Sequence, residues 1–375
     1  MNQKHLGALI ATKSIPLHNG EKILVFNSGD GTLALALAEK FPQSHFLLYE
    51  SNVGMSNSLL KKLQSSPDFK NVCIIFEDEL AQIRQTDNNL LDVVVFEPRR
   101  FTALDLNKFQ ILAGKPLLKP GGRFYLVTHK RVGSSRHEKM LTDIFGVDVR
   151  TVGKGRGGYK VLESIKNSVF CSRSRQDFGA PQTNEQTEWN LRRKIHFEIF
   201  DIAFDLESEP SLFSKDDLDL GTRILLEKVN LTSFESMLDL GCGWGAIGLV
   251  AAVINKNGHV VLTDIDSRAA KVASDNVQRL GLQNRVSVIA TDDVRQIDGS
   301  FDLILSNPPF HADMVTLVNL FKAASDKLRK KGSTYVVVEK TYLSKLNKVL
   351  EQTFQHVKVC HEDINTNFFV LVSRK

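Results

Sequence analysis

The chain has 375 residues, enough for two domains of ordinary size, each with its own hydrophobic core. The formal net charge is +5, which favours polyanionic partners, while the absence of a long apolar run argues against membrane insertion. The first ten residues lack a signal-like apolar core, so we expect a cytoplasmic protein. Four scattered cysteines without metal-ligand spacing indicate a reducing compartment and no metal centre: Cys73, Cys171, Cys242 and Cys360.

Residues 1–165 are predicted to form a first α/β domain. The apolar run that starts at Lys22 leads into a turn with Gly29 and Gly31, and the run from Leu91 to Phe96 stops at Glu97. Short apolar runs bounded by turn residues are typical of central parallel strands. A Pro-Gly-Gly turn at 119–123 then leads into a fifth strand.

The end of this domain is rich in glycine and in basic residues. Residues 152–162 combine Lys154, Arg156 and Lys160 with four glycines. This pattern fits either a flexible basic loop that contacts phosphates or a tight hairpin before the last strand, and both interpretations stay open. Residues 166–187 are polar and predict an interdomain linker, after which residues 189–204 alternate as in a hairpin.

Residues 188–375 are predicted to form the second domain, which begins its sheet with a glycine-rich turn. The run from Met237 passes through Asp239 into Gly241, Gly243 and Gly245 before a helix. Such glycines let the backbone approach a ligand, and the helix start offers free amides to an anion. The spacing Gly-x-Gly-x-x-Gly at 243–248 also satisfies the dinucleotide fingerprint, so a nicotinamide cofactor has to be considered.

Acidic residues follow the next two predicted strands. Asp264 lies nineteen residues after Gly245, at the end of the run 259–263, where it can accept hydrogen bonds from both ribose hydroxyls of either cofactor. Asp292 follows the strand 286–290 and is the candidate for the adenine amine, with Asp293 as a nearly equal candidate. Either acid could instead be a helix cap.

The fourth strand, residues 301–306, ends at the tetrapeptide Asn307, Pro308, Pro309 and Phe310. The prolines end the strand because neither can donate to a sheet ladder. Ligands of open α/β sheets bind at the carboxyl ends of the strands, so this edge is the candidate site. His311 is a candidate proton acceptor, although a histidine beside a turn is more often a surface residue.

The remaining pattern predicts a helix over 315–329, a strand over 334–339 and an amphipathic helix over 342–354. We expect Lys345 and Lys348 on the solvent side of that last helix. Two final strands, around 356–360 and 368–372, predict an antiparallel hairpin at the end of the sheet.

The first domain reads as an altered copy of the second, and internal duplication is the expected cause. The segment ending at Gly31 aligns without a gap with the one ending at Gly245, and each glycine is nineteen residues from an acid, Glu50 or Asp264. The two domains differ at the positions where cofactor binding and catalysis are expected in the second domain. Val25, Asn27, Glu97 and Arg99 stand at the positions of Asp239, Gly241, Asn307 and Pro309, so we expect no catalysis from the first domain.

Two motifs resemble those of methyltransferases. The pattern Asp239-x-Gly241-x-Gly243-x-Gly245 resembles the cofactor loop of Rossmann-like class I enzymes that bind S-adenosylmethionine. The residues 307–310 look like the (N/D)PP(F/Y/W) motif of enzymes that methylate exocyclic or amide nitrogens, a motif for which hydride transfer has no use. By resemblance, the Asn307 side-chain oxygen and the Pro308 carbonyl accept the amine hydrogens, and Phe310 stacks on the base.

A third motif narrows the resemblance from methyltransferases in general to one family. Residues 212–222 resemble the segment F-S-x-x-x-L-D-x-G of the bacterial ribosomal RNA guanine-(N2) methyltransferases, a family with two tandem domains of which the first is degenerate. The resemblance is strong over 212–311 and only architectural before 165. It implies two mostly parallel seven-stranded sheets, each with an antiparallel C-terminal strand, and S-adenosylmethionine as cofactor. It also implies methylation of a guanine 2-amino group in 16S or 23S ribosomal RNA, by a monomer that meets RNA or a ribosomal subunit.

Two other functions are compatible with these residues. A protein-glutamine N-methyltransferase is the enzymatic alternative, because Asn-Pro-Pro motifs also serve amide nitrogens. A non-catalytic RNA-binding or ribosome-assembly factor is the second, although the cofactor and amine motifs of residues 239–310 are intact. The basic balance and the tandem copy favour the RNA enzyme.

Overall fold

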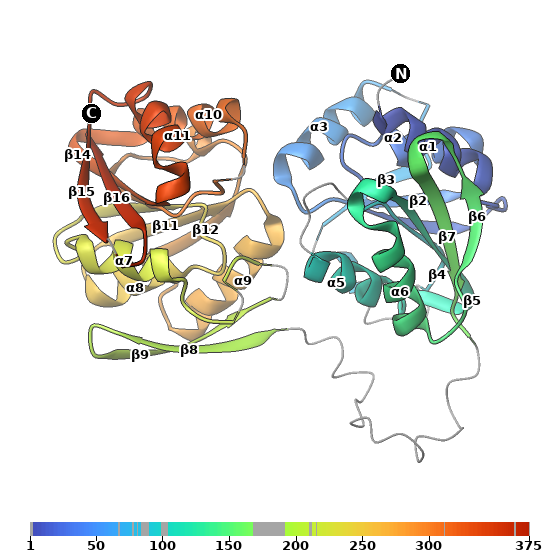
Figure 1. Ribbon diagram of the computed structural model, residues 1–375, viewed down its shortest axis with the longest axis horizontal. Coiled ribbons are helices and arrows are strands. Elements are labelled where there is room, and N and C mark those ends of the chain that lie inside the picture. Colours follow the sequence, from blue (N-terminus) through green and yellow to red (C-terminus); the bar gives the residue numbers. More distant parts are fainter. Residues whose placement is uncertain are drawn as a thin grey trace, which may run out of the picture. The chain divides into compact units, whose positions relative to one another are not determined.

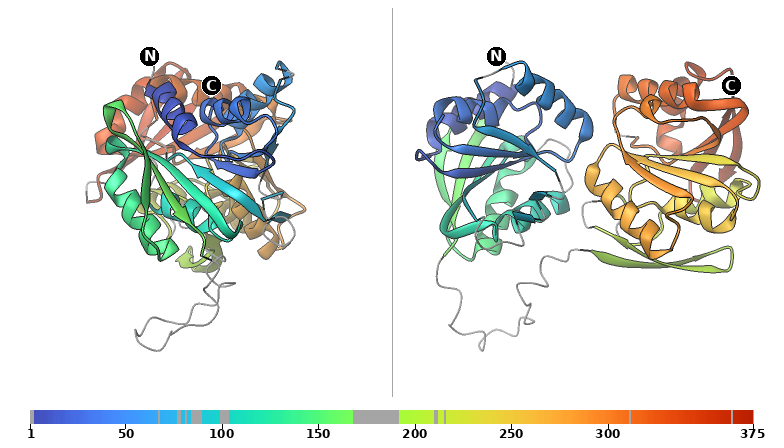
Figure 2. Two further views of the ribbon diagram at one scale, coloured as in Figure 1. Left: turned by 90° about the vertical axis from the view of Figure 1, so that its right-hand side faces the viewer. Right: turned by 180° about the vertical axis from the view of Figure 1, so that it is seen from behind.

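The computed structural model describes residues 3–66, 68–76, 79–80, 82–83, 90–98, 104–167, 192–209, 212–214, 216–310, 312–363 and 365–374. Contacts divide the chain into two compact units, Met1–Leu191 and Arg192–Lys375, which we call the first and the second domain. Each domain holds one seven-stranded, mostly parallel sheet between helices (Figures 1 and 2), which confirms the predicted α/β fold. From residue 168 onward the predicted linker lies outside the described residues.

The sheet of the first domain has the strand order β3-β2-β1-β4-β5-β7-β6. Its strands are β1 Lys22–Phe26, β2 His45–Tyr49, β3 Val72–Ile75, β4 Leu91–Phe96, β5 Leu118–His129, β6 Arg150–Lys154 and β7 Tyr159–Ile165. The described helices are α1 Gln3–Ser14, α2 Thr32–Lys40, α3 Val53–Gln64, α5 Leu104–Gly114 and α6 Ser134–Phe145. Strands β6 and β7 are antiparallel neighbours, so the glycine-rich segment 152–162 forms a hairpin, as one of its two interpretations predicted.

The sheet of the second domain repeats this order as β12-β11-β10-β13-β14-β16-β15. Its strands are β10 Ser236–Leu240, β11 His259–Asp264, β12 Val286–Ala290, β13 Phe301–Ser306, β14 Leu328–Glu339, β15 His356–Asp363 and β16 Phe368–Arg374. Its helices are α7 Leu220–Lys228, α8 Ala246–Ile254, α9 Ser267–Arg279, α10 Met314–Lys327 and α11 Lys340–Glu351. Strand β16 is antiparallel to both β14 and β15, which confirms the predicted tail hairpin.

Two apolar layers hold the second sheet. Buried side chains of α7, α8 and α9 pack on one face, and those of α10 and α11 pack on the other (Figure 1). Central strands that are covered on both faces need nearly continuous apolar sequence, which explains why β13 could be predicted with its observed bounds. None of the described helices is both long enough and apolar enough to cross a membrane.

A separate hairpin lies against the α7, α8 and α9 layer. It consists of β8 Arg193–Ile199 and β9 Ile202–Ser208, four residues later than the predicted range 189–204. Asn276 of α9 joins three segments: its Oδ1 accepts from Glu207 N at 2.8 Å, and its Nδ2 donates to Glu207 O at 2.8 Å and Trp244 O at 2.9 Å. The hairpin therefore supports the glycine-rich turn through the buried amide of Asn276 and through Phe197, whose ring centroid lies 6.0 Å from that of Trp244.

Candidate active site

The predicted site residues of the second domain meet at one edge of its sheet. Strands β10, β11, β12 and β13 are parallel, so the residues that follow them gather at their carboxyl ends. Ser306 at the end of β13 donates its hydroxyl to Leu240 O at 2.7 Å, directly before the glycines. The amine motif and the glycine-rich turn are therefore neighbours in space, although 66 positions separate the bonded residues.

The glycine-rich turn leaves open space along its backbone. Gly241 and Gly243 have φ values of 78° and 56°, and apart from their chain neighbours no atom of the described residues lies within 4 Å of the place where either would carry a Cβ. A side chain at these positions would be strained and would extend into the space above the turn. Gly245 is different, because its Cβ would lie 2.9 Å from Leu262 and 3.0 Å from Leu249. The first two glycines thus keep a surface open, and the third allows close packing.

Asp264 is fixed beside this open surface. Its Oδ2 accepts from Gly243 N at 2.9 Å, and its Oδ1 accepts from Asp266 N at 2.9 Å. Burial raises the pKa of this carboxyl to about 6, against the backbone hydrogen bonds that lower the pKa. The carboxylate keeps further lone pairs for a ligand, because each of its oxygens carries two.

Asp239 lies inside the turn instead of on its surface. It is fully buried, its Oδ2 accepts from Gly248 N at 2.8 Å, and its Oδ1 has no hydrogen-bond partner among the described residues. Burial raises its pKa to about 7, and the nearby Asp264 carboxyl raises it further while the Gly248 amide opposes the shift. Asp239 therefore anchors the start of α8 beneath the turn.

The raised pKa of Asp239 predicts how stability depends on pH. The folded state binds a proton that the unfolded state releases near pH 4, so this stabilisation is lost as the pH rises through about 7. Between about pH 5 and about pH 8, the wild type should lose roughly 2–3 kcal/mol of unfolding free energy relative to Asp239→Asn. Urea unfolding followed by Trp244 fluorescence in a Trp189→Phe background measures this difference, and a pH-independent difference would contradict the prediction.

The structure distinguishes the two acids that follow β12. Asp293 caps the short helix Val294–Gln296, where its Oδ1 accepts from Arg295 N at 3.0 Å and from Arg295 Nε at 2.8 Å. The hydrogen bond from Arg295 is the first reason why the pKa of Asp293 is lowered. Asp293 thus serves as a helix cap, and Asp292 is the more exposed side chain at the same strand end.

Asn307 follows β13 and is held by the start of α7. Its Nδ2 donates to Asp219 Oδ2 at 2.9 Å and to Thr222 Oγ1 at 3.0 Å. No hydrogen bond to Oδ1 of Asn307 is present within the described part of the chain. Pro308 is buried, Pro309 is exposed, and His311 lies outside the described residues. The amide nitrogen therefore faces the protein, and the amide oxygen remains available.

Helix α11 supports the aromatic end of the motif. The Phe310 ring stacks on Tyr342, with ring centroids 5.5 Å apart and an interplanar angle of 13°. Lys345 donates its ammonium to Phe310 O at 3.0 Å and also to Ala312 O. The prediction that Lys345 faces solvent is therefore wrong. Its side chain is half-buried, and two carbonyls of the adjacent loop accept its hydrogens.

Removing the Lys345 ammonium should loosen the loop that contains Phe310 and Ala312, without leaving a cavity in the hydrophobic core. Lys345→Met keeps most of the side-chain length but loses both hydrogen bonds, so kcat should fall about tenfold and unfolding free energy by about 1–2 kcal/mol. Lys348→Met is the matched control, because Lys348 lies one turn further along α11 and is exposed. Thermal unfolding and steady-state kinetics of the two variants test this, and equal behaviour would exclude a role for Lys345.

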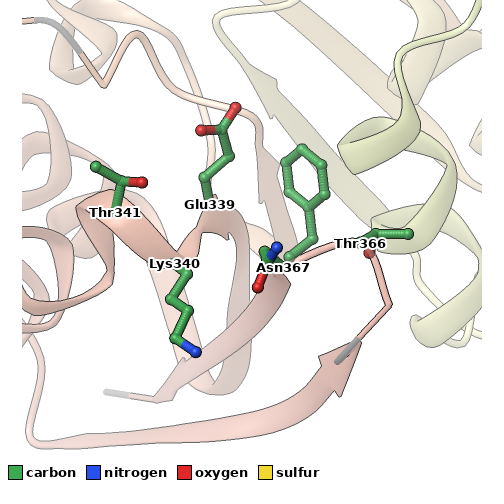
Figure 3. Close-up of a pocket in the computed structure, with 6 residues that line it drawn as sticks. Glu339, Lys340, Thr341, Thr366 and Asn367 are labelled. Carbon is green, nitrogen blue, oxygen red and sulfur yellow. The ribbon is translucent and has the colours of Figure 1, made fainter.

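A cavity of about 460 Å³ lies at the same sheet edge, at the carboxyl end of β14. Figure 3 shows Glu339, Lys340 and Thr341 where β14 passes into α11, and Thr366 and Asn367 on the turn before β16. The two segments are joined by a hydrogen bond from Lys340 N to Asn367 O at 2.8 Å. Phe368 completes the lining and contacts Gly221 in the first turn of α7. The cavity is one strand away from Asn307.

The first domain keeps part of this arrangement and changes the rest. Glu50 accepts from Gly29 N at 2.7 Å and from Asn52 N at 2.9 Å, as Asp264 does with its own turn. Asn27 replaces the open Gly241, however, and its side chain is bonded to Gln110 in both directions, at 3.0 Å and 2.6 Å. Glu97 lies beside α1, where its Oε1 is 3.1 Å from the place of a Cβ on Gly7. Arg99 lies outside the described residues.

Several supporting residues were missed by the sequence argument. The indole of Trp244 is buried and donates to Ser214 O at 3.2 Å, which ties the glycine-rich turn to the segment before α7. Asp219, Thr222 and Tyr342 also contact motif residues directly. For Asp219 the sequence signal is the Leu-Asp-x-Gly pattern at 218–221, which enters the sequence analysis as part of a family resemblance.

Comparisons with known proteins give a family match for the second domain and several relatives of the chain. Residues 203–371 match the methyltransferase small domain family. A ribosomal RNA small subunit methyltransferase C of Actinobacillus succinogenes is 35% identical over 209 residues, which is 51% of this chain and 60% of that protein. The Aeromonas hydrophila protein of the same name is 27% identical over 308 residues, 77% of this chain and 84% of its own length.

A solved structure extends the likeness in fold to both domains. It is a T. thermophilus 16S rRNA methyltransferase (RsmC) in complex with AdoMet and guanosine, with a TM-score of 0.75 and 20% sequence identity over 98% of this chain and 91% of that one. At this identity the match establishes the tandem fold. Over residues 203–371 the second domain therefore matches the methyltransferase small domain family, and the two domains share the tandem fold of that solved structure.

Proposed function

We propose that the second domain transfers a methyl group from S-adenosylmethionine to the 2-amino group of a guanine in ribosomal RNA. The observation that carries this proposal is the placement of Asn307 and the glycine-rich turn at one sheet edge, joined by the bond from Ser306 to Leu240. The names of the relatives support the substrate class, since they describe ribosomal RNA methyltransferases. This substrate also places the proposed reaction in the cytoplasm.

The residues of the edge fit the proposed cofactor. The backbone of Gly241 and Gly243 borders open space with φ values that other residues rarely adopt, which suits close approach of a ligand. Asp264 would accept the ribose hydroxyls, and Asp292 would accept from the adenine amine. Asp239 would hold the turn from inside. When bound, the cofactor supplies an electrophilic methyl group on a sulfonium.

The residues after β13 would prepare the amine. The 2-amino lone pair of guanine is delocalised into the ring, so the nitrogen is a poor nucleophile. Asn307 Oδ1 and the Pro308 carbonyl would accept its two hydrogens and favour a more pyramidal nitrogen, while Phe310 would stack on the base. A paired guanine hides this amine, so the base has to leave its helix before it reaches the edge.

We further propose that the first domain holds RNA and does not transfer methyl groups. Its differences at Asn27 and Glu97 support the second half of this statement. Exposed cations support the first half, because phosphate contacts by lysine and arginine dominate affinity for nucleic acids. Three of them follow β5 and reach the first turn of α6: Lys130, Arg131 and Arg136. The other two, Lys154 and Arg156, lie at the β6–β7 turn, where Gly158 lies against the Lys130 side chain.

A transfer assay separates this function from its alternatives. The full-length protein is incubated with tritium-labelled cofactor and, in parallel, with ribosomal RNA, with each ribosomal subunit and with a protein extract, all from a strain lacking the protein. Label in RNA that digests to 2-methylguanosine supports the proposal. Label in protein would support the glutamine methyltransferase, and no transfer to any substrate would support the non-catalytic factor.

A further inference from the structure

The chemistry proposed for Asn307 works in only one of two orientations of its side chain. A primary amide has nearly the same shape after a 180° flip, but the flip exchanges an acceptor with a donor. Only the orientation with Oδ1 toward the substrate can accept hydrogens from an amine. The flipped amide would present its own hydrogens to a group that also carries hydrogens. The site therefore needs something that selects the orientation.

Asp219 provides this selection. Its Oδ2 lies 2.9 Å from the Asn307 amide, and a carboxylate can only accept hydrogen bonds, so the amide atom facing it has to be nitrogen. A flipped amide would bring two oxygens to this distance and would lose a charge-assisted hydrogen bond. Thr222 cannot select the orientation, because its hydroxyl can both donate and accept.

Asp219 is itself held in place by the start of α7. It is the N-cap of this helix, and its Oδ2 accepts from Thr222 N at 2.9 Å. A Cβ on Gly221 would lie 3.1 Å from that same oxygen and 2.8 Å from the Phe368 ring. A larger residue at 221 would thus displace either Asp219 or the wall of the neighbouring cavity. The Leu-Asp-x-Gly pattern therefore has a physical explanation. Asp219 supplies the carboxylate that contacts Asn307, and Gly221 leaves the space that this carboxylate occupies.

We infer that Asp219 is a positioning residue that locks the Asn307 amide with its oxygen toward the substrate amine, an inference that rests on the proposed function. Asp219 acts through Asn307, across 88 positions of sequence, and touches neither reactant. The segment before α7 is then part of the methyl-acceptor side of the site, in addition to any contact it makes with the cofactor.

The substitution Asp219→Asn tests this lock. Asparagine is also a good N-cap, so α7 should stay intact, but its amide can face Asn307 with either oxygen or nitrogen. We expect kcat to fall roughly 10- to 100-fold, with KM for RNA, cofactor Kd and melting temperature unchanged. Asp313→Asn is the matched control, because Asp313 caps α10 with the same geometry and is bonded to Thr316 instead of Asn307. It should retain normal kcat.

A reciprocal exchange gives the decisive readout. In Asn307→Asp alone, two carboxylates would face each other and kcat should be low. In the double variant Asp219→Asn with Asn307→Asp, the new amide can donate to the new carboxylate, whose other oxygen faces the amine. We expect kcat of the double variant to recover at least about tenfold above the lower of the two single variants.

Each outcome of this series decides the inference. A normal kcat in Asp219→Asn, or a double variant that remains at the level of the worse single variant while it folds and binds cofactor, would overturn the lock alone. Absence of methyl transfer to guanine by the wild-type protein would overturn the proposed function and this inference together.

Discussion

Replacing Asn307 by alanine is expected to lower kcat by about 10²–10³-fold, as removal of one preorganised hydrogen-bonding group does in other active sites. The variant loses the amide oxygen that would accept an amine hydrogen, while the backbone of the motif and its support by Lys345 remain. The dissociation constant of the cofactor should not change, because Asp264 and the glycine-rich turn make no hydrogen bond to Asn307. Single-turnover methyl transfer and equilibrium binding measure the two quantities separately.

Two controls make this result specific. Asn230→Ala changes an exposed asparagine that only caps its own turn, through bonds to Thr232, and should leave kcat unaffected. A melting temperature equal to that of the wild type would show that Asn307→Ala is folded. A normal single-turnover rate in a folded Asn307→Ala protein would refute the amine-orienting role.

Replacing Asp264 by alanine should raise the dissociation constant of the cofactor roughly a hundredfold. The loss of two hydrogen bonds from ribose hydroxyls to a carboxylate corresponds to about 3 kcal/mol. The variant also frees the amide of Gly243, although the amides of Gly241 and Cys242 still donate to Thr263 O in β11. At saturating cofactor, kcat should recover much of its wild-type value, because the amine-binding residues are unchanged. Isothermal titration and cofactor-dependent kinetics test both parts.

The pKa of Asp264 adds a signature that a packing defect would not produce. The ionised form accepts ribose hydroxyls better than the protonated form, and burial raises the pKa to about 6. Cofactor affinity of the wild type should therefore increase as the pH rises through about 6, and Asp264→Asn should lack this increase.

The wild-type titration with cofactor should also give one binding site per chain. A second site of similar affinity would contradict the proposal that the first domain is inactive.

Local sequence determined much of the fold and most of the candidate site. Strand β13 could be predicted with its observed bounds because a strand buried on both faces is apolar throughout, and the two prolines mark its end. The glycines of the turn could be predicted because positive φ and close approach leave few other residues possible. Parallel strands then bring Asp264, Asp292 and Asn307 to a common edge, since the carboxyl ends of such strands coincide.

Only the tertiary structure decided how these residues are supported. The bond from Asn307 to Asp219 spans 88 positions, and the bond from Lys345 to Phe310 spans 35. Periodicity reports how a side chain relates to its own helix or strand, and it carries no information on which distant carbonyl or carboxylate will lie within hydrogen-bonding distance. For the same reason the periodicity of α11 did not reveal the carbonyl partners of Lys345, and the local pattern around Trp244 did not reveal that its indole donates to Ser214 O.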